Sequence, residues 1–241
     1  MAHIRFVGAA VLLASVATIQ ADEPRRVKID AHSPPECTPQ FAPLEAGSSN
    51  SRSPLTFWRR DEVGAWDGDG WLGWTYGDDA LVPVSLVVRD WPKERADDED
   101  EVTIESSADV TFAMRCITVP TLHIRSAGVG NHSLRHREPL RIALGARKYE
   151  LVLRGSREDL TDAEVVLTEG HRTQVLYSTD GFVDEPVFLV KWAGDLDGDG
   201  LLDVVVVLTR KYSVHPYRLL LSSLAVPDEL VAEAARFEVF D

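Results

Sequence analysis

The stretch that decides the fold is Asp195-Leu196-Asp197-Gly198-Asp199-Gly200-Leu201-Leu202-Asp203, followed directly by Val204-Val205-Val206-Val207-Leu208-Thr209. Its first part has aspartates at loop positions 1, 3, 5 and 9 and a glycine at position 6. Alternate residues of a tight loop can point at one centre, and calcium prefers several oxygen ligands in a flexible geometry. A polar turn that binds nothing is the alternative, because Gly and Asp also favour turns. Since four converging carboxylates repel one another without a cation, the spacing predicts a calcium site formed by Asp195, Asp197, Asp199 and Asp203.

The residues around the loop predict strands, which argues against a helical calcium motif. An EF-hand needs a bidentate glutamate at position 12 and helices on both sides of its loop. Position 12 is Val206, within a run of β-branched residues that is typical of a buried strand. The segment before the loop, Pro186 to Trp192, also has the composition of a strand. The loop therefore joins two strands, and Asp203 at position 9 must complete the site.

The loop and its flanks, Ala193 to Val206, resemble the calcium hairpin of FG-GAP/VCBS-type repeats, found in integrin α-chain propellers and many exported bacterial proteins. The wider segment from Trp192 to Phe237 resembles the C-terminal part of a group of secreted bacterial proteins that carry one such hairpin. The resemblance implies side-chain ligands from the four aspartates and a backbone carbonyl ligand from Leu201. The Phe-Gly-Gly-Ala-Pro element of an FG-GAP repeat and a second copy of the loop are both missing, which argues against a full propeller.

The N-terminus has the features of a secretory signal peptide, predicted over residues 1–21. Arg5 supplies a positive start, residues 6–19 are apolar, and the small residue Ala21 precedes a polar segment. Cleavage after Ala17 is the alternative to cleavage after Ala21. The apolar stretch is too short for a comfortable membrane span, so we expect no membrane insertion after cleavage. These features predict an exported protein, periplasmic or extracellular.

The two cysteines, Cys37 and Cys116, both lie beyond the predicted signal peptide. An oxidising compartment favours their pairing, and with two cysteines the connectivity is forced if both are oxidised. The bridge would tie an N-terminal arm to a central strand. Two separate buried thiols are the alternative.

The charge of the chain bounds its partners. The 241 residues carry a formal net charge of −14 at pH 7, and loss of Arg5 with the signal peptide makes it −15. Binding to nucleic acid or to anionic membranes needs a basic surface, so this charge argues against both. The sequence predicts no nucleic-acid partner, and it leaves the oligomeric state open.

Short strand-like runs separated by turn signals fill the chain beyond the signal peptide. They predict a mainly β, antiparallel fold of meander or sandwich type, with one short helix over Asp228 to Ala235. Tyr217 to Leu221 is predicted to return beside Val204 to Leu208. The segment Asp67-Gly68-Asp69-Gly70 has the wrong spacing for a second calcium loop and is predicted to form a hairpin turn. We divide the chain into an extended arm (22–53), an aromatic-rich β region (54–125) and a β region with the calcium hairpin (126–241), of which the last two could form one domain.

Four tryptophans of the aromatic-rich region allow two interpretations. These residues are Trp58, Trp66, Trp71 and Trp74. They either fill a β core or form an exposed platform for sugars or peptide segments.

The sequence favours a non-catalytic role. His132 and His136 lack the glutamate of a zinc-protease motif, and no Gly-x-Ser-x-Gly nucleophile motif is present. Carboxylate pairs for glycoside hydrolysis are defined by their separation in space, so the sequence does not test them. We expect a calcium-stabilised structural or interaction module with a protein or glycan partner at the cell envelope. The alternative is a cell-envelope hydrolase with a purely structural calcium site.

Overall fold

The computed structural model describes residues 37–44, 58–63, 66–90, 101–155, 160–181 and 183–240. The predicted signal peptide, most of the predicted arm and the cleavage alternatives lie outside these residues. Within them the chain is mainly β and antiparallel, as the sequence predicts, and it forms neither a full propeller nor a closed barrel. No helix of the described residues is long and apolar enough to cross a membrane.

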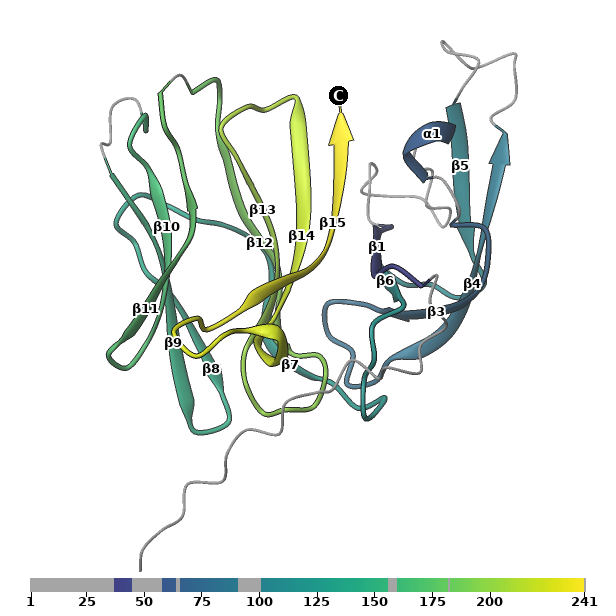
Figure 1. The fold of residues 1–241 in the computed structure, drawn as a ribbon, viewed down its shortest axis with the longest axis horizontal. Coiled ribbons are helices and arrows are strands. Elements are labelled where there is room, and N and C mark those ends of the chain that lie inside the picture. The colour runs from purple at the N-terminus through teal and green to yellow at the C-terminus, as the bar shows by residue number, and fades with distance from the viewer. Residues whose placement is uncertain are drawn as a thin grey trace, which may run out of the picture.

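The N-terminal strands form one six-stranded antiparallel sheet with the order β1-β6-β3-β4-β5-β2 (Figure 1). Its strands are β1 (Gln40–Pro43), β2 (Trp58–Arg59), β3 (Gly68–Trp74), β4 (Val82–Asp90), β5 (Glu101–Ser106) and β6 (Phe112–Arg115), and the short helix α1 (Arg60–Val63) follows β2.

The remaining strands form two further antiparallel sheets, one of five strands in the order β15-β14-β13-β12-β7 and one of four in the order β11-β10-β9-β8. Their bounds are β7 (Arg125–Ser133), β8 (Leu140–Leu144), β9 (Arg147–Arg154), β10 (Glu164–Glu169), β11 (Arg172–Ser178), β12 (Val187–Asp195), β13 (Asp203–Thr209), β14 (Val214–Leu221) and β15 (Ala232–Phe240). The 3-10 helix η1 (Ser222–Leu224) follows β14.

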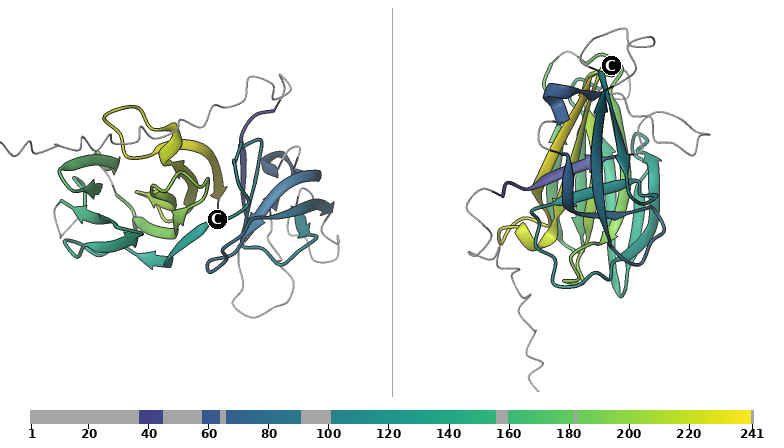
Figure 2. Two further views of the ribbon diagram at one scale, coloured as in Figure 1. Left: turned by 90° about the horizontal axis from the view of Figure 1, so that it is seen from below. Right: turned by 90° about the vertical axis from the view of Figure 1, so that its right-hand side faces the viewer.

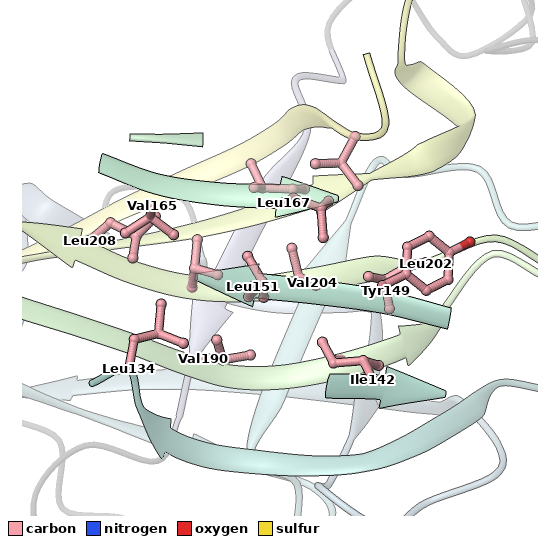
Figure 3. Close-up of a cluster of buried hydrophobic side chains, with 14 of the residues drawn as sticks. Leu134, Ile142, Tyr149, Leu151, Val165, Leu167, Val190, Leu202, Val204 and Leu208 are labelled. Atoms are coloured by element: carbon pink, nitrogen blue, oxygen red, sulfur yellow. The ribbon is translucent and has the colours of Figure 1, made fainter. Parts of the chain in front are cut away.

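The five-stranded sheet lies between the other two, as the views in Figures 1 and 2 show. This position explains the uninterrupted apolar run of β13, in which every residue is buried, because a strand covered on both faces has no polar side. Val204 and Val206 pack toward the four-stranded sheet in one core cluster, which Figure 3 shows. Val205 packs in a second cluster together with Trp74 and other residues of the six-stranded sheet. The strand thus anchors two cores at once.

Three of the four tryptophans are core residues. Trp66, Trp71 and Trp74 are at most 4% exposed, so the exposed platform is wrong for them. The side chain of Trp58 lies outside the described residues. Trp74 contacts Trp192 of β12 edge to face with 6.1 Å between ring centroids, and this pair joins the six-stranded sheet to the five-stranded one.

One local prediction is confirmed and two are wrong. Tyr217 to Leu221 does return beside β13, with Leu220 opposite Val204. The predicted helix over Asp228 to Ala235 is wrong, because its second half begins β15; the helical turn near the C-terminus is η1 instead. The Asp67–Gly70 hairpin turn is also wrong. Its last three residues are the first three of β3, whose register against β4 shifts between Gly68 and Trp71 as in a β-bulge.

The predicted disulfide between Cys37 and Cys116 is present, with a Cα–Cα distance of 5.6 Å. It links the residues just before β1 to the end of β6. The arm is therefore held to the six-stranded sheet at Cys37, and neither cysteine is free.

Candidate metal centre

The aspartate loop connects β12 to β13 at one end of the five-stranded sheet. Asp195 is the last residue of β12, and Asp203 is the first residue of β13. Gly194 and Asp203 face each other in the antiparallel pair, so the two ends of the loop are held together by the sheet. Gly198 and Gly200 have φ angles of +79° and +80°, a region in which other residues are strained. The glycines thus let the loop reverse tightly enough for its aspartates to converge.

Two leucines fasten the loop to the two cores. Leu196 is fully buried in the cluster shared with the six-stranded sheet. Leu202 is 1% exposed and belongs to the cluster shared with the four-stranded sheet (Figure 3). A loop anchored on both sides holds its polar residues in fixed positions between these anchors.

The carboxylates of Asp195, Asp197 and Asp203 converge, with one oxygen of each within 4.8 Å of the others. Asp197 and Asp203 are fully buried, and Asp195 is 5% exposed. In the part of the chain that the structure describes, no other group of three or more His, Cys, Asp or Glu side chains comes together in this way. Three of the four aspartates singled out by their spacing therefore form one acidic cluster that could hold a metal ion.

Backbone amides of the loop fix the direction of these carboxylates. The amides of Gly198 and Gly200 donate to the two oxygens of Asp195, at 2.7 and 3.0 Å. The amide of Leu196 donates to Oδ2 of Asp203 at 2.7 Å. Each carboxylate oxygen has two lone pairs, so these bonds orient the group and leave acceptor capacity for a cation.

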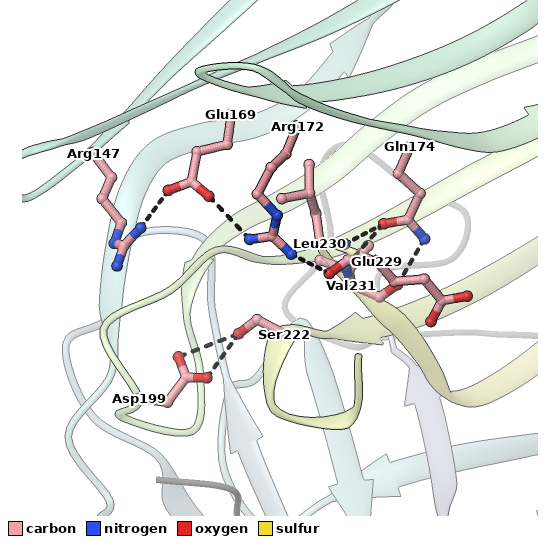
Figure 4. Close-up of polar contacts among 9 residues, drawn as sticks. All are labelled: Arg147, Glu169, Arg172, Gln174, Asp199, Ser222, Glu229, Leu230 and Val231. Carbon is pink, nitrogen blue, oxygen red and sulfur yellow. Dashed lines mark hydrogen bonds and ion pairs between the residues drawn. The ribbon is translucent and has the colours of Figure 1, made fainter. Parts of the chain in front are cut away.

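Two serines that the sequence reasoning missed complete the surroundings of the cluster. The Ser222 hydroxyl lies 3.0 Å from Oδ2 of Asp199, a contact that Figure 4 shows. The same hydroxyl lies 2.9 Å from Oδ1 of Asp203, and the Ser222 backbone amide donates to that oxygen at 2.8 Å. The Ser223 hydroxyl donates to Oδ2 of Asp197. Both serines belong to η1, directly after β14. The sequence predicts that Tyr217 to Leu221 returns beside Val204 to Leu208, and in the structure Leu220 lies opposite Val204. The end of β14 therefore lies beside Asp203, and the predicted return of this strand was the signal that could have located the serines.

The fourth aspartate, Asp199, takes a different place. It is partly exposed, it is not in the group of three, and its carboxylate accepts hydrogen bonds from Ser222 and from the amide of Leu201, the latter at 2.7 Å. Its role as a ligand and that of the Leu201 carbonyl stay predictions.

Burial raises the pKa of all three clustered carboxyl groups. Loss of solvent is the main cause for Asp195 and for Asp197, whose pKa rises to about 6. For Asp203 loss of solvent comes first and the nearby charge of Asp197 second, and the pKa lies well above the usual value. The buried charges are thus costly, and a bound cation would offset this cost directly.

Ion pairs and hydrogen bonds link residues of β9, β10 and β11 to one another and to the connection between η1 and β15. Glu169 pairs with Arg147 at 2.5 Å and with Arg172 at 3.4 Å, and Arg172 donates to the carbonyl of Glu229 at 2.6 Å (Figure 4). Gln174 accepts from the amides of Leu230 and Val231 at 2.6 and 3.0 Å. These bonds tie the segment after η1 to the four-stranded sheet.

The donor set fits a hard divalent cation. All the converging side-chain atoms are carboxylate oxygens, which suit calcium, magnesium and manganese better than zinc or copper.

The chain matches no protein-family model, and comparisons with curated proteins and with solved structures find no match.

Proposed function

We propose that this is an exported, calcium-binding β protein in which calcium stabilises the fold and the protein acts as a structural or interaction module, not as a catalyst. Its partner in this proposal is a protein or a glycan at the cell envelope. The observation that carries the proposal is the convergence of three buried carboxylates within 4.8 Å in a loop anchored to two cores.

Calcium is favoured over magnesium because three buried carboxylates converge here, whereas magnesium is usually bound through one or two carboxylates. Magnesium demands a near-ideal octahedron and keeps several waters, whereas calcium accepts six to eight oxygens in irregular arrangements. The resemblance of Ala193 to Val206 to an FG-GAP/VCBS-type hairpin supports the same ion. Asp199 and the Leu201 carbonyl would add two oxygens to those of the buried group.

Export is supported by two independent features. The first 21 residues have the pattern of a signal peptide. The Cys37–Cys116 disulfide belongs to the kind of bond that persists in oxidising compartments. Extracellular calcium modules bind at about 10⁻⁴ to 10⁻³ M, which suits a permanent structural ion outside the cytoplasm.

The test is thermal unfolding of the oxidised protein in EDTA and in millimolar calcium. Saturation to about ten times the dissociation constant adds about 1.4 kcal/mol, so the midpoint should rise by a few degrees. Asp203→Asn should abolish the rise. The control is Asp69→Asn, which changes an exposed aspartate that also precedes a glycine, and this variant should keep the rise. An equal rise with magnesium would contradict the assignment to calcium, and no rise with either ion would contradict the site itself.

A further inference from the structure

We infer that the slot occupied by β1 is an interaction surface for an extended strand, and that a second copy of this chain can fill it by donating its own β1. The inference is independent of the metal centre. It rests on how β1 is held between β6 and β15.

β1 is an edge strand that is buried like a central one. Phe41, Ala42 and Leu44 are at most 3% exposed, although the strand has only the four residues Gln40–Pro43 and pairs on one side alone, with β6. Its other side lies next to β15, which belongs to a different sheet (Figure 2, left). The strand is therefore inserted between two sheets rather than laid along an outer rim.

The two faces of β1 fill two different clusters. Phe41 packs on Trp74 and Phe112, with ring centroids 6.1 and 6.0 Å apart, in the cluster shared with the five-stranded sheet. Ala42 and Leu44 point the other way, into the cluster that contains Phe237 of β15. Alternation along a strand produces this division. The slot thus selects an extended segment with an aromatic residue followed by small and aliphatic ones.

Polar contacts fix the register of the strand in the slot. Gln40 accepts two hydrogen bonds from the guanidinium of Arg115, at 3.1 and 2.6 Å. At the other end the amide of Leu44 donates to the carbonyl of Thr111 at 2.8 Å. Without β1 the outer backbone groups of β6 would lose their partners and two apolar clusters would open, which is the arrangement that strand addition exploits.

The sequence that complements this slot is the chain's own. Residues 40–44 supply the aromatic side chain, the aliphatic ones and the glutamine that pairs with Arg115. A second copy offers the same segment, and exchange of an identical element is a low-cost route to a dimer. The Cys37–Cys116 bond closes the arrangement within one chain, so exchange is open to chains in which that bond has not formed.

The experiment traps exchange with single-cysteine variants of the full chain. A donor, Cys116→Ser, keeps Cys37, and an acceptor, Cys37→Ser, keeps Cys116. The two are unfolded in guanidinium, mixed, and refolded together with oxidised glutathione, which is reduced to two glutathione molecules as it takes the electrons and protons of the two thiols. A Cys37–Cys116 bond between copies forms readily only if the donor's β1 occupies the acceptor's slot.

With equal amounts of donor and acceptor, random pairing gives about two mixed dimers for each Cys37–Cys37 or Cys116–Cys116 dimer. We expect the mixed Cys37–Cys116 dimers, identified by peptide mapping, to exceed this ratio clearly. Phe41→Asp in the donor should remove this excess, and Thr38→Asp, at an exposed position beside the strand, should keep it. A peptide of residues 37–44 with Cys37→Ser should also reduce the excess by competing for the slot, and this test adds no further substitution to the two variants. Absence of mixed dimers would overturn the inference, as would mixed dimers that neither Phe41→Asp nor the peptide reduces.

Discussion

Replacing Asp197 by asparagine should stabilise the metal-free protein while removing its response to calcium. Asn has nearly the shape of Asp, and its side-chain oxygen can still accept from the amide of Asp199, which lies 3.3 Å from Asp197 Oδ1. The side-chain amide can donate to the Ser223 hydroxyl, which now donates to Asp197. The substitution therefore removes a buried negative charge with little loss of packing.

The magnitude follows from the pKa of Asp197. In the folded protein this pKa is raised from 3.8 to about 6, and one pKa unit corresponds to about 1.4 kcal/mol, so the ionised carboxylate costs about 3 kcal/mol at neutral pH. Asp197→Asn should recover a large part of that cost. For a chain of this size the metal-free unfolding midpoint should rise by about 5 to 10 °C.

The assay is thermal and urea unfolding of the wild type and Asp197→Asn at pH 7, each in EDTA and in calcium. In EDTA the variant should be the more stable protein; calcium should stabilise the wild type and leave the variant nearly unchanged. The exposed Asp69→Asn serves as the charge-matched control and should follow the wild type in both buffers. A variant less stable than the wild type in EDTA would refute the reasoning, because it would mean that the buried charge is not a cost to the metal-free fold.

Three further predictions concern pH, the serines and the cross-link. In EDTA the free energy of unfolding should fall as the pH rises from about 4 to about 6, because in this range the folded protein keeps the Asp197 proton that the unfolded chain has lost. Urea midpoints across this range measure the effect, and midpoints that rise with pH would contradict it. Ser222→Ala should weaken calcium binding about 10-fold or more by removing a hydroxyl that orients two carboxylates, whereas Ser178→Ala, on an exposed strand position, should not. Reduction of the Cys37–Cys116 bond, which joins residues 79 apart, should lower the free energy of unfolding by up to about 4 kcal/mol. Urea titrations with and without reductant measure this loss. A loss near zero would contradict the prediction and would show that β1 stays docked without the disulfide.

The sequence was sufficient for the features that depend on local pattern. The Asp-x-Asp-x-Asp-Gly spacing identified the loop, and the β-branched run after it identified a strand covered on both faces, which β13 is. The turn signals Gly145-Ala146 and Glu169-Gly170 each lie between two strand-like runs and predict two hairpins, which are β8 with β9 and β10 with β11. These features follow from a few neighbouring residues, so no knowledge of the tertiary structure is needed.

The features that the sequence did not reveal depend on distant parts of the chain. Ser222 contacts Asp203 only because β14 pairs with β13, and two adjacent serines carry no signal by themselves. The helix expected over Asp228 to Ala235 reflected the helix propensity of Glu and Ala, but pairing with β14 imposes a strand on Ala232–Phe240. Inside that strand Ala235 and Phe237 are buried while Arg236 is exposed, so alternation was present but weak. Tertiary contacts decided this segment.

Isothermal titration of calcium into the metal-free, oxidised protein tests the central claim most directly. The account predicts binding with one site per chain, weakened strongly by Asp195→Asn or Asp203→Asn and unchanged by Asp69→Asn. Binding that survives substitution of the clustered aspartates, or no binding at millimolar calcium, would contradict the claim that this loop holds a calcium ion.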